Sequence, residues 1–136
     1  MEKNNEVTNI FITVSDAKIF LPKFNINTVE VNTAAYNIAR NYNLSIYKTI
    51  IVNHEGKIKY NISERNSYGN ITDSYKEIST KTIKRLSILW NIRKDSIAPC
   101  NICEFRLCCT VAHIPLKKEN GYAVNCNYDP YKAELN

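Results

Sequence analysis

Glycine and proline are scarce in this 136-residue chain, which has three glycines and four prolines. Long linkers and disordered segments are therefore not expected. No apolar run approaches the length needed to span a bilayer. The polar start, MEKNNEVTN, is not a signal peptide. These absences favour a cytoplasmic protein with one modest domain and no membrane partner.

Motifs of the common catalytic mechanisms are missing as well. The sequence has no glycine-rich phosphate loop, no Ser/His/Asp set at a nucleophile turn and no carboxylate pair with a reason for a shifted pKa. Of the two histidines, His54 falls in an expected turn, and His113 stands between apolar residues. Independent catalysis is therefore not expected.

The net charge of +5 comes from basic residues that are spread along the chain. The strongest basic cluster combines five side chains, those of Lys81, Lys84, Arg85, Arg93 and Lys94. We interpret this cluster as a solvated helix face, and we expect no nucleic-acid partner. A weak attraction for acidic peptides stays open.

Residue patterns in the first half predict one strand and one helix. β-branched and aromatic residues at 9–14 predict a strand, which residues 18–21 continue. Alanines and isoleucine at helical spacing predict a short helix over 32–42.

The middle of the chain predicts a β-hairpin. Two β-rich runs, 49–53 and 57–62, flank Gly56, which tolerates the positive φ of a tight connection. A second turn is expected at Tyr68-Gly69-Asn70.

Two helices should follow. Asp73 can cap a short helix over 74–78. A second helix is predicted over 80–92, where three residues recur on one face that we expect to pack on the hairpin: Ile83, Leu86 and Trp90, with Leu89 beside them. The sequence thus predicts an α+β fold with a hairpin and two or three short helices.

From residue 100 onward the sequence predicts mostly irregular chain, with turns at Asn120-Gly121 and Asp129-Pro130. Irregular segments of that length are uncommon in compact domains unless something else orders them. A metal centre would supply the missing free energy. We therefore expect the C-terminal region to be organised around a metal cluster.

All cysteines lie in this region, at positions 100, 103, 108, 109 and 126. The Cys100-x2-Cys103 pair lets two thiolates converge on one metal, and two more complete a four-sulfur shell. One of the adjacent Cys108 and Cys109 is then a spare. The spacing alone leaves zinc and a [4Fe–4S] cluster as equal alternatives. A thiol–disulfide pair at Cys100 and Cys103 is a third alternative, and His113 in place of one sulfur is a fourth.

Three motifs carry a resemblance to a known family: Trp90-Asn91-Ile92-x-Lys94-Asp95, the Cys-x2-Cys-Glu-Phe-Arg run at 100–106, and Cys126-Asn127-Tyr128-x-Pro130-Tyr131. With them, residues 38–132 resemble the C-terminal SPASM domain of radical-SAM peptide maturases of the grasp-with-spasm type. The resemblance implies that residues 1–37 are a remnant of the region that ends the preceding barrel. It implies that residues 38–136 form a SPASM-like iron–sulfur domain.

The family's spacing also implies the ligands. One auxiliary [4Fe–4S] cluster, with zinc as the alternative metal, would be held by four thiolates: those of Cys100, Cys103, Cys109 and Cys126. Cys108 is then the spare. Glu104 and Arg106 are expected to pair locally or to hydrogen-bond around the sulfurs. Phe105 and Leu107 are expected to pack beneath the cluster.

A second family cluster is expected to be absent. With Gly56 fixing the register, Ser45 and Asn61 stand where the family has cysteines. Serine and asparagine are poor ligands for cluster iron.

The family's S-adenosylmethionine-cleaving motif, Cys-x3-Cys-x2-Cys, does not occur in the chain. The resemblance therefore implies a stand-alone or truncated module that is not a self-sufficient radical-SAM enzyme. Its implied partners are a ribosomally made precursor peptide, a radical-SAM maturase and an ATP-grasp ligase. The alternatives are a zinc-stapled module that binds a peptide or a maturase without redox activity, and an inactive gene remnant.

Overall fold

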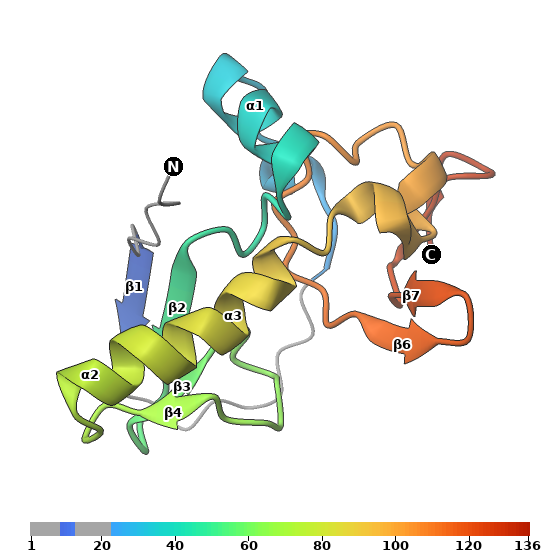
Figure 1. The fold of residues 1–136 in the computed structure, drawn as a ribbon. Helices are drawn as coiled ribbons and strands as arrows, with labels where there is room; N and C mark the ends of the chain where they lie inside the picture. The colour runs from blue at the N-terminus through green and yellow to red at the C-terminus, as the bar shows by residue number, and fades with distance from the viewer. Residues whose placement is uncertain (1–8, 13–22) are drawn as a thin grey trace. The chain divides into compact units, whose positions relative to one another are not determined.

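The computed structural model describes residues 9–12 and 23–136, which form an α+β fold of short helices and small sheets (Figure 1). The chain divides into two compact units. We call the described residues 9–12 and 46–90 the sheet unit, and residues 23–45 and 91–136 the cysteine unit. The α+β expectation is confirmed. The division between residues 37 and 38, which followed from the family resemblance, stays a prediction.

A four-stranded sheet in the order β1-β2-β3-β4 forms the centre of the sheet unit. Its strands are β1 (Asn9–Ile12), β2 (Thr49–Val52), β3 (Lys57–Lys59) and β4 (Gly69–Asn70). The first pair is parallel and the other pairs are antiparallel. The strand predicted at 9–14 is confirmed for 9–12, whereas residues 13–14 and 18–21 lie outside the described residues.

The predicted hairpin is confirmed as β2 and β3, although β3 ends before residue 62. Gly56 has a φ of +76°, and a Cβ there would lie 2.9 Å from Ile71 Cγ2, so the connection requires glycine. The turn expected at residues 68–70 is wrong in one respect, because Gly69 and Asn70 form β4 and pair with β3. A Cβ on Gly69 would collide with Thr82 Oγ1.

The two predicted helices are instead one continuous helical stretch. α2 (Tyr75–Glu77) leads through a π-helical segment, η2 (Ile78–Thr82), into α3 (Ile83–Trp90). The cap is Ser74 rather than Asp73: Ser74 Oγ accepts the Glu77 N–H at 3.3 Å in a capping box. The Asp73 carboxylate instead accepts the Asn70 N–H at 2.7 Å.

The predicted apolar face of this helical stretch is buried. Ile83, Leu86 and Trp90 are buried, with Leu86 fully inaccessible. The stretch crosses one face of the sheet in Figure 1, and η2 contacts β4. The Tyr47 ring meets Trp90 edge-on, with the ring centroids 6.1 Å apart. Ile50, Val52 and Ile58 of the hairpin strands are buried as well.

The cysteine unit begins with η1 (Ile26–Thr28) and α1 (Thr33–Asn41). α1 confirms the helix predicted over 32–42. Asn32 caps it, because its Oδ1 accepts the Ala35 N–H at 2.7 Å.

The rest of the cysteine unit is less irregular than predicted. It contains η3 (Lys94–Ser96), β5 (Ile97–Ala98), η4 (Cys100–Ile102), β6 (Leu116–Lys118), β7 (Gly121–Ala123), β8 (Tyr128–Asp129) and β9 (Glu134–Leu135). The strands form one sheet in the order β5-β7-β6 and one pair, β8-β9. Both predicted turns are confirmed, since Asn120-Gly121 ends the connection from β6 to β7 and Asp129-Pro130 begins the connection from β8 to β9.

The segment at residues 24–30 pairs with chain that is far away in the sequence. Thr28 C=O accepts the Thr110 N–H at 2.8 Å, and Glu30 N–H donates to Cys108 C=O at 2.8 Å. The Asn127 amide makes two bonds to the Phe24 backbone, at 2.7 and 3.0 Å. This segment is therefore built into the cysteine-rich part of the unit.

Candidate metal centre

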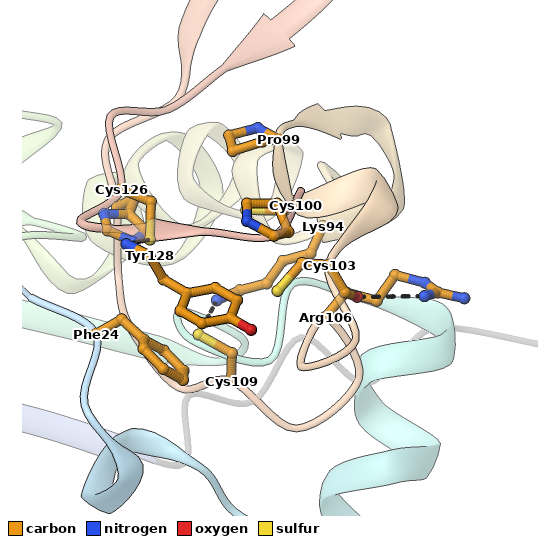
Figure 2. Close-up of a pocket in the computed structure, with 11 residues that line it drawn as sticks. Phe24, Lys94, Pro99, Cys100, Cys103, Arg106, Cys109, Cys126 and Tyr128 are labelled. Carbon is orange, nitrogen blue, oxygen red and sulfur yellow. Dashed lines mark hydrogen bonds between the residues drawn. The ribbon is translucent and has the colours of Figure 1, made fainter. Parts of the chain in front are cut away.

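Four cysteines line one cavity of the cysteine unit, with an empty volume of about 350 Å³ including space open to solvent. They are Cys100, Cys103, Cys109 and Cys126, the four candidate ligands. Figure 2 shows their side chains around the cavity. Cys108 does not line it. The fold thus brings together the four sulfurs that the sequence singled out and leaves the fifth aside.

Local backbone geometry positions these sulfurs. Cys103 N–H donates to Cys100 C=O at 3.0 Å across the single turn of η4, so the two cysteines stand one turn apart. An isolated β-bridge with Val29 holds Cys109. Strand β5 comes directly before η4 in the chain and pairs with β7 in the sheet. Cys126 follows β7.

Three aromatic rings form one apolar side of the centre. The ring centroids of Phe24 lie 5.0 Å from those of Phe105 and Tyr128, and the latter two are 5.3 Å apart. Cys109 and Cys126 pack in the same cluster. Phe105 packs in this aromatic cluster but does not line the cavity, and Leu107 belongs to neither. The expectation that both residues pack beneath a metal cluster stays a prediction.

Glu104 and Arg106 bond around the centre, but no ion pair joins them within the described chain. Glu104 accepts a hydrogen bond from the Tyr128 hydroxyl, and this bond lowers the pKa of the Glu104 carboxyl. Arg106 Nη1 donates to Cys103 C=O at 3.3 Å. Both side chains thus brace residues of the cavity wall.

Two of the cavity thiols, those of Cys100 and Cys103, have raised pKa values, which favours their protonated form. Burial raises the pKa of Cys100 to about 11; the Lys94 charge opposes this rise, and the other three cavity sulfurs add to it. Burial also raises the pKa of Cys103. A metal that binds here must therefore displace protons, and its binding releases them.

The interpretation of the basic cluster as a solvated helix face is wrong for Lys94. Lys81, Lys84 and Arg85 are exposed, as a solvated face requires, but Lys94 is only 6% exposed. Its ammonium lies 3.1 Å from Cys109 Sγ and 3.0 Å from Val111 O (Figure 2, dashed line to Cys109). No periodicity in the sequence distinguishes this lysine from its exposed neighbours.

His113 also lines the cavity, and its Nε2 atom is buried without a hydrogen-bond partner among the described residues. Burial, reinforced by the Lys94 charge, lowers the pKa of His113 to about 4, so the imidazole is neutral at pH 7. Buried polar atoms without a partner are rare and call for a specific explanation, such as a bound ion. His113 Nε2 fits a cavity that receives a polar or inorganic group.

The buried His113 predicts a pH dependence of stability in the metal-free protein. Between about pH 6.5, the usual histidine value, and pH 4, the unfolded chain binds a proton that the folded chain does not. We therefore expect the free energy of unfolding to fall as the pH drops through this window and to level off below it. Urea titrations of the wild type and His113→Gln should diverge there. Identical profiles would contradict the buried neutral state.

The cavity cysteines do not form a preassembled site for a metal ion. Among residues 9–12 and 23–136, no group of three or more His, Cys, Asp or Glu side chains is placed so that it could hold a metal ion. A zinc ion needs four sulfurs at about 2.3 Å from one point. A [4Fe–4S] cluster carries its irons at separate corners, so its thiolates lie around a larger body.

Ser45 and Asn61, at the family's other cysteine positions, lie in different units. Ser45 Oγ donates to Val111 C=O at 2.8 Å. Asn61 is buried, and its Oδ1 accepts the Ser63 N–H at 2.8 Å. Both side chains serve as local hydrogen-bonding groups.

All five cysteines are free thiols, so the thiol–disulfide alternative finds no bonded pair. In the part of the chain that the structure describes, no helix combines the length and apolar character that crossing a membrane requires. Comparison of the chain with models of protein families, with curated proteins and with solved structures finds no match.

Proposed function

We propose that the cysteine unit binds one [4Fe–4S] cluster as the auxiliary site of a SPASM-type module. Its ligands are the four cavity thiolates, those of Cys100, Cys103, Cys109 and Cys126. The supporting observation is that these four line one cavity while Cys108, adjacent to one of them, does not. The cysteine that stays outside the cavity is the one that the family's spacing also leaves out.

The cavity wall supports a cluster in two further respects. The rings of Phe24 and Tyr128 make one side apolar, which limits the access of water. Lys94 and His113 bring nitrogen atoms to the same cavity. The potential of an iron–sulfur cluster depends on hydrogen bonds to its sulfurs and on solvent exposure, so these residues suit a redox group.

With four thiolate ligands the cluster has no open iron, so when bound it supplies electron transfer or structural order rather than substrate activation. S-adenosylmethionine cleavage would come from a separate radical-SAM peptide maturase, since the chain has no Cys-x3-Cys-x2-Cys motif. The further partners that we propose are a ribosomally made precursor peptide and an ATP-grasp ligase. A reducing compartment, the cytoplasm, would keep the thiols free.

A zinc-stapled binding module without redox activity is the second candidate. The observation in its favour is the closed set of four thiols with Cys100 and Cys103 one turn apart, which is typical of structural zinc sites. In that case the side chains would have to converge further than they do in this structure.

Anaerobic reconstitution with iron and sulfide, in parallel with zinc, tests both candidates. We expect a brown protein with about four irons and four sulfides per chain. Protein whose thiols are alkylated beforehand is the control for adventitious iron. A colourless protein that holds about one zinc and refuses iron would favour the second candidate. Retention of neither metal would overturn both and favour an inactive remnant.

A further inference from the structure

The most unusual charge in the cysteine unit is that of Lys94. The residue is 6% exposed, and its ammonium donates to two acceptors, Cys109 Sγ and Val111 O. In the described chain, no carboxylate forms an ion pair with it. Burying an unpaired charge costs several kcal/mol or more. The location therefore requires negative charge in or beside the cavity.

The other charged side chains near the cavity do not supply this negative charge. Arg106 also lines the cavity and is itself cationic, and its guanidinium donates to Cys103 C=O. Glu104 is exposed, bonded to the Tyr128 hydroxyl, and does not line the cavity. The cavity wall thus carries positive charge without a carboxylate. A group in the cavity that balances this positive charge would be an anion.

We propose that Lys94 is the built-in countercharge of the bound cluster and that its hydrogen bond to the Cys109 sulfur raises the cluster's reduction potential. This inference rests on the proposed function. A cluster with four thiolates is anionic and gains one more negative charge on reduction. A fixed cation at 3.1 Å from one ligand sulfur therefore stabilises the reduced state more than the oxidised state.

The redox step itself is a one-electron transfer. In the assay the electron comes from dithionite, which is oxidised while the cluster is reduced. No bond to the protein forms or breaks. Lys94 is thus a positioning residue that acts through the Cys109 sulfur.

The test is an anaerobic redox titration of the iron-loaded protein, with four variants compared with the wild type. Lys94→Met and Lys94→Gln remove the charge, Lys94→Arg keeps it, and Lys117→Met removes a charge from the exposed strand β6. At a fixed potential we expect the ratio of reduced to oxidised cluster to fall at least tenfold in the two neutral variants. For a one-electron couple this is about 59 mV toward lower potential. Lys94→Arg and Lys117→Met should stay close to the wild type.

Each outcome either supports or overturns the role of Lys94 as the countercharge. Neutral variants that load iron and titrate like the wild type overturn it. If the neutral variants lose the cluster while Lys94→Arg keeps it, the countercharge is supported. If Lys94→Arg loses it as well, the side chain's shape matters rather than its charge, and the inference is overturned. A wild type that binds no cluster refutes the proposed function itself, before any variant is compared.

Discussion

Replacing Cys103 and Cys126 together by alanine is expected to abolish cluster binding. Cys103 directly follows η4, and Cys126 follows β7, so the two residues come from separate segments, yet their side chains line the same cavity. With two of four thiolates missing, the remaining pair cannot close a cluster shell. We expect iron to fall from about four per chain to a background level, below about one.

The same variant should lose the stability that the metal provides. Metal binding contributes directly to folding free energy when the site does not exist in the unfolded chain. The melting temperature of the double variant should therefore match that of the metal-free wild type. Iron analysis and calorimetry check the two expectations together. Unchanged iron content and melting temperature would contradict the proposed ligand set.

Cys108→Ala is the matched control. Cys108 is adjacent to Cys109 but does not line the cavity. Its Sγ lies 3.5 Å from Phe105 C=O instead. We expect this variant to bind iron like the wild type. Loss of iron comparable to that of the double variant would mean that Cys108, rather than its neighbour, is the ligand.

Phe24→Ala is expected to cause the largest loss of stability in the cysteine unit. Phe24 is 7% exposed, and its ring contacts those of Phe105 and Tyr128. Removing a buried phenylalanine side chain costs about 3–5 kcal/mol. Because Phe24 also lines the cavity, water should reach a bound cluster more easily, and its lifetime in air should shorten.

Urea titration of the metal-free protein measures the first effect, and the decay of visible absorbance in air measures the second. Tyr131→Ala is the control, since Tyr131 is 81% exposed and surface substitutions change stability by about 0.5 kcal/mol or less. A cost for Phe24→Ala as small as that of the control would show that the aromatic cluster does not stabilise the unit.

Sequence patterns were most informative where one local rule determines the structure. The hairpin at Gly56 follows from the need for positive φ, and α1 follows from apolar spacing. The buried face of α3 follows from helical periodicity. The break expected between α2 and α3 is absent because the π-helical segment η2 carries the chain through without a cap.

The strands of the cysteine unit could not be predicted in this way. β5 to β9 contain two or three residues each, which is too short for a repeating pattern, and β6 is exposed throughout. Their turns were predictable because Asn120-Gly121 and Asp129-Pro130 restrict the backbone locally.

The family resemblance singled out the four cavity thiols, whereas cysteine spacing alone left Cys108 and Cys109 as alternatives. The rest of the site depends on distant pairing. Lys94 is buried because the chain at Cys109 and Val111 folds over it. No local pattern in the sequence predicts this burial. The position of Phe24 depends on Asn127, 103 residues away. Contacts over such distances have no signature in a single sequence.

The two hydrogen bonds between the Asn127 side chain and the Phe24 backbone limit where the chain can be shortened. A shortened version that starts at residue 38 would leave behind the ring of Phe24, which lines the cavity, and Val29, which bridges to Cys109. Asn127 would also lose both of its backbone partners on Phe24. Without these residues, one side of the cavity that the four cysteines line would be missing. Any minimal version designed for expression should therefore begin upstream of Phe24.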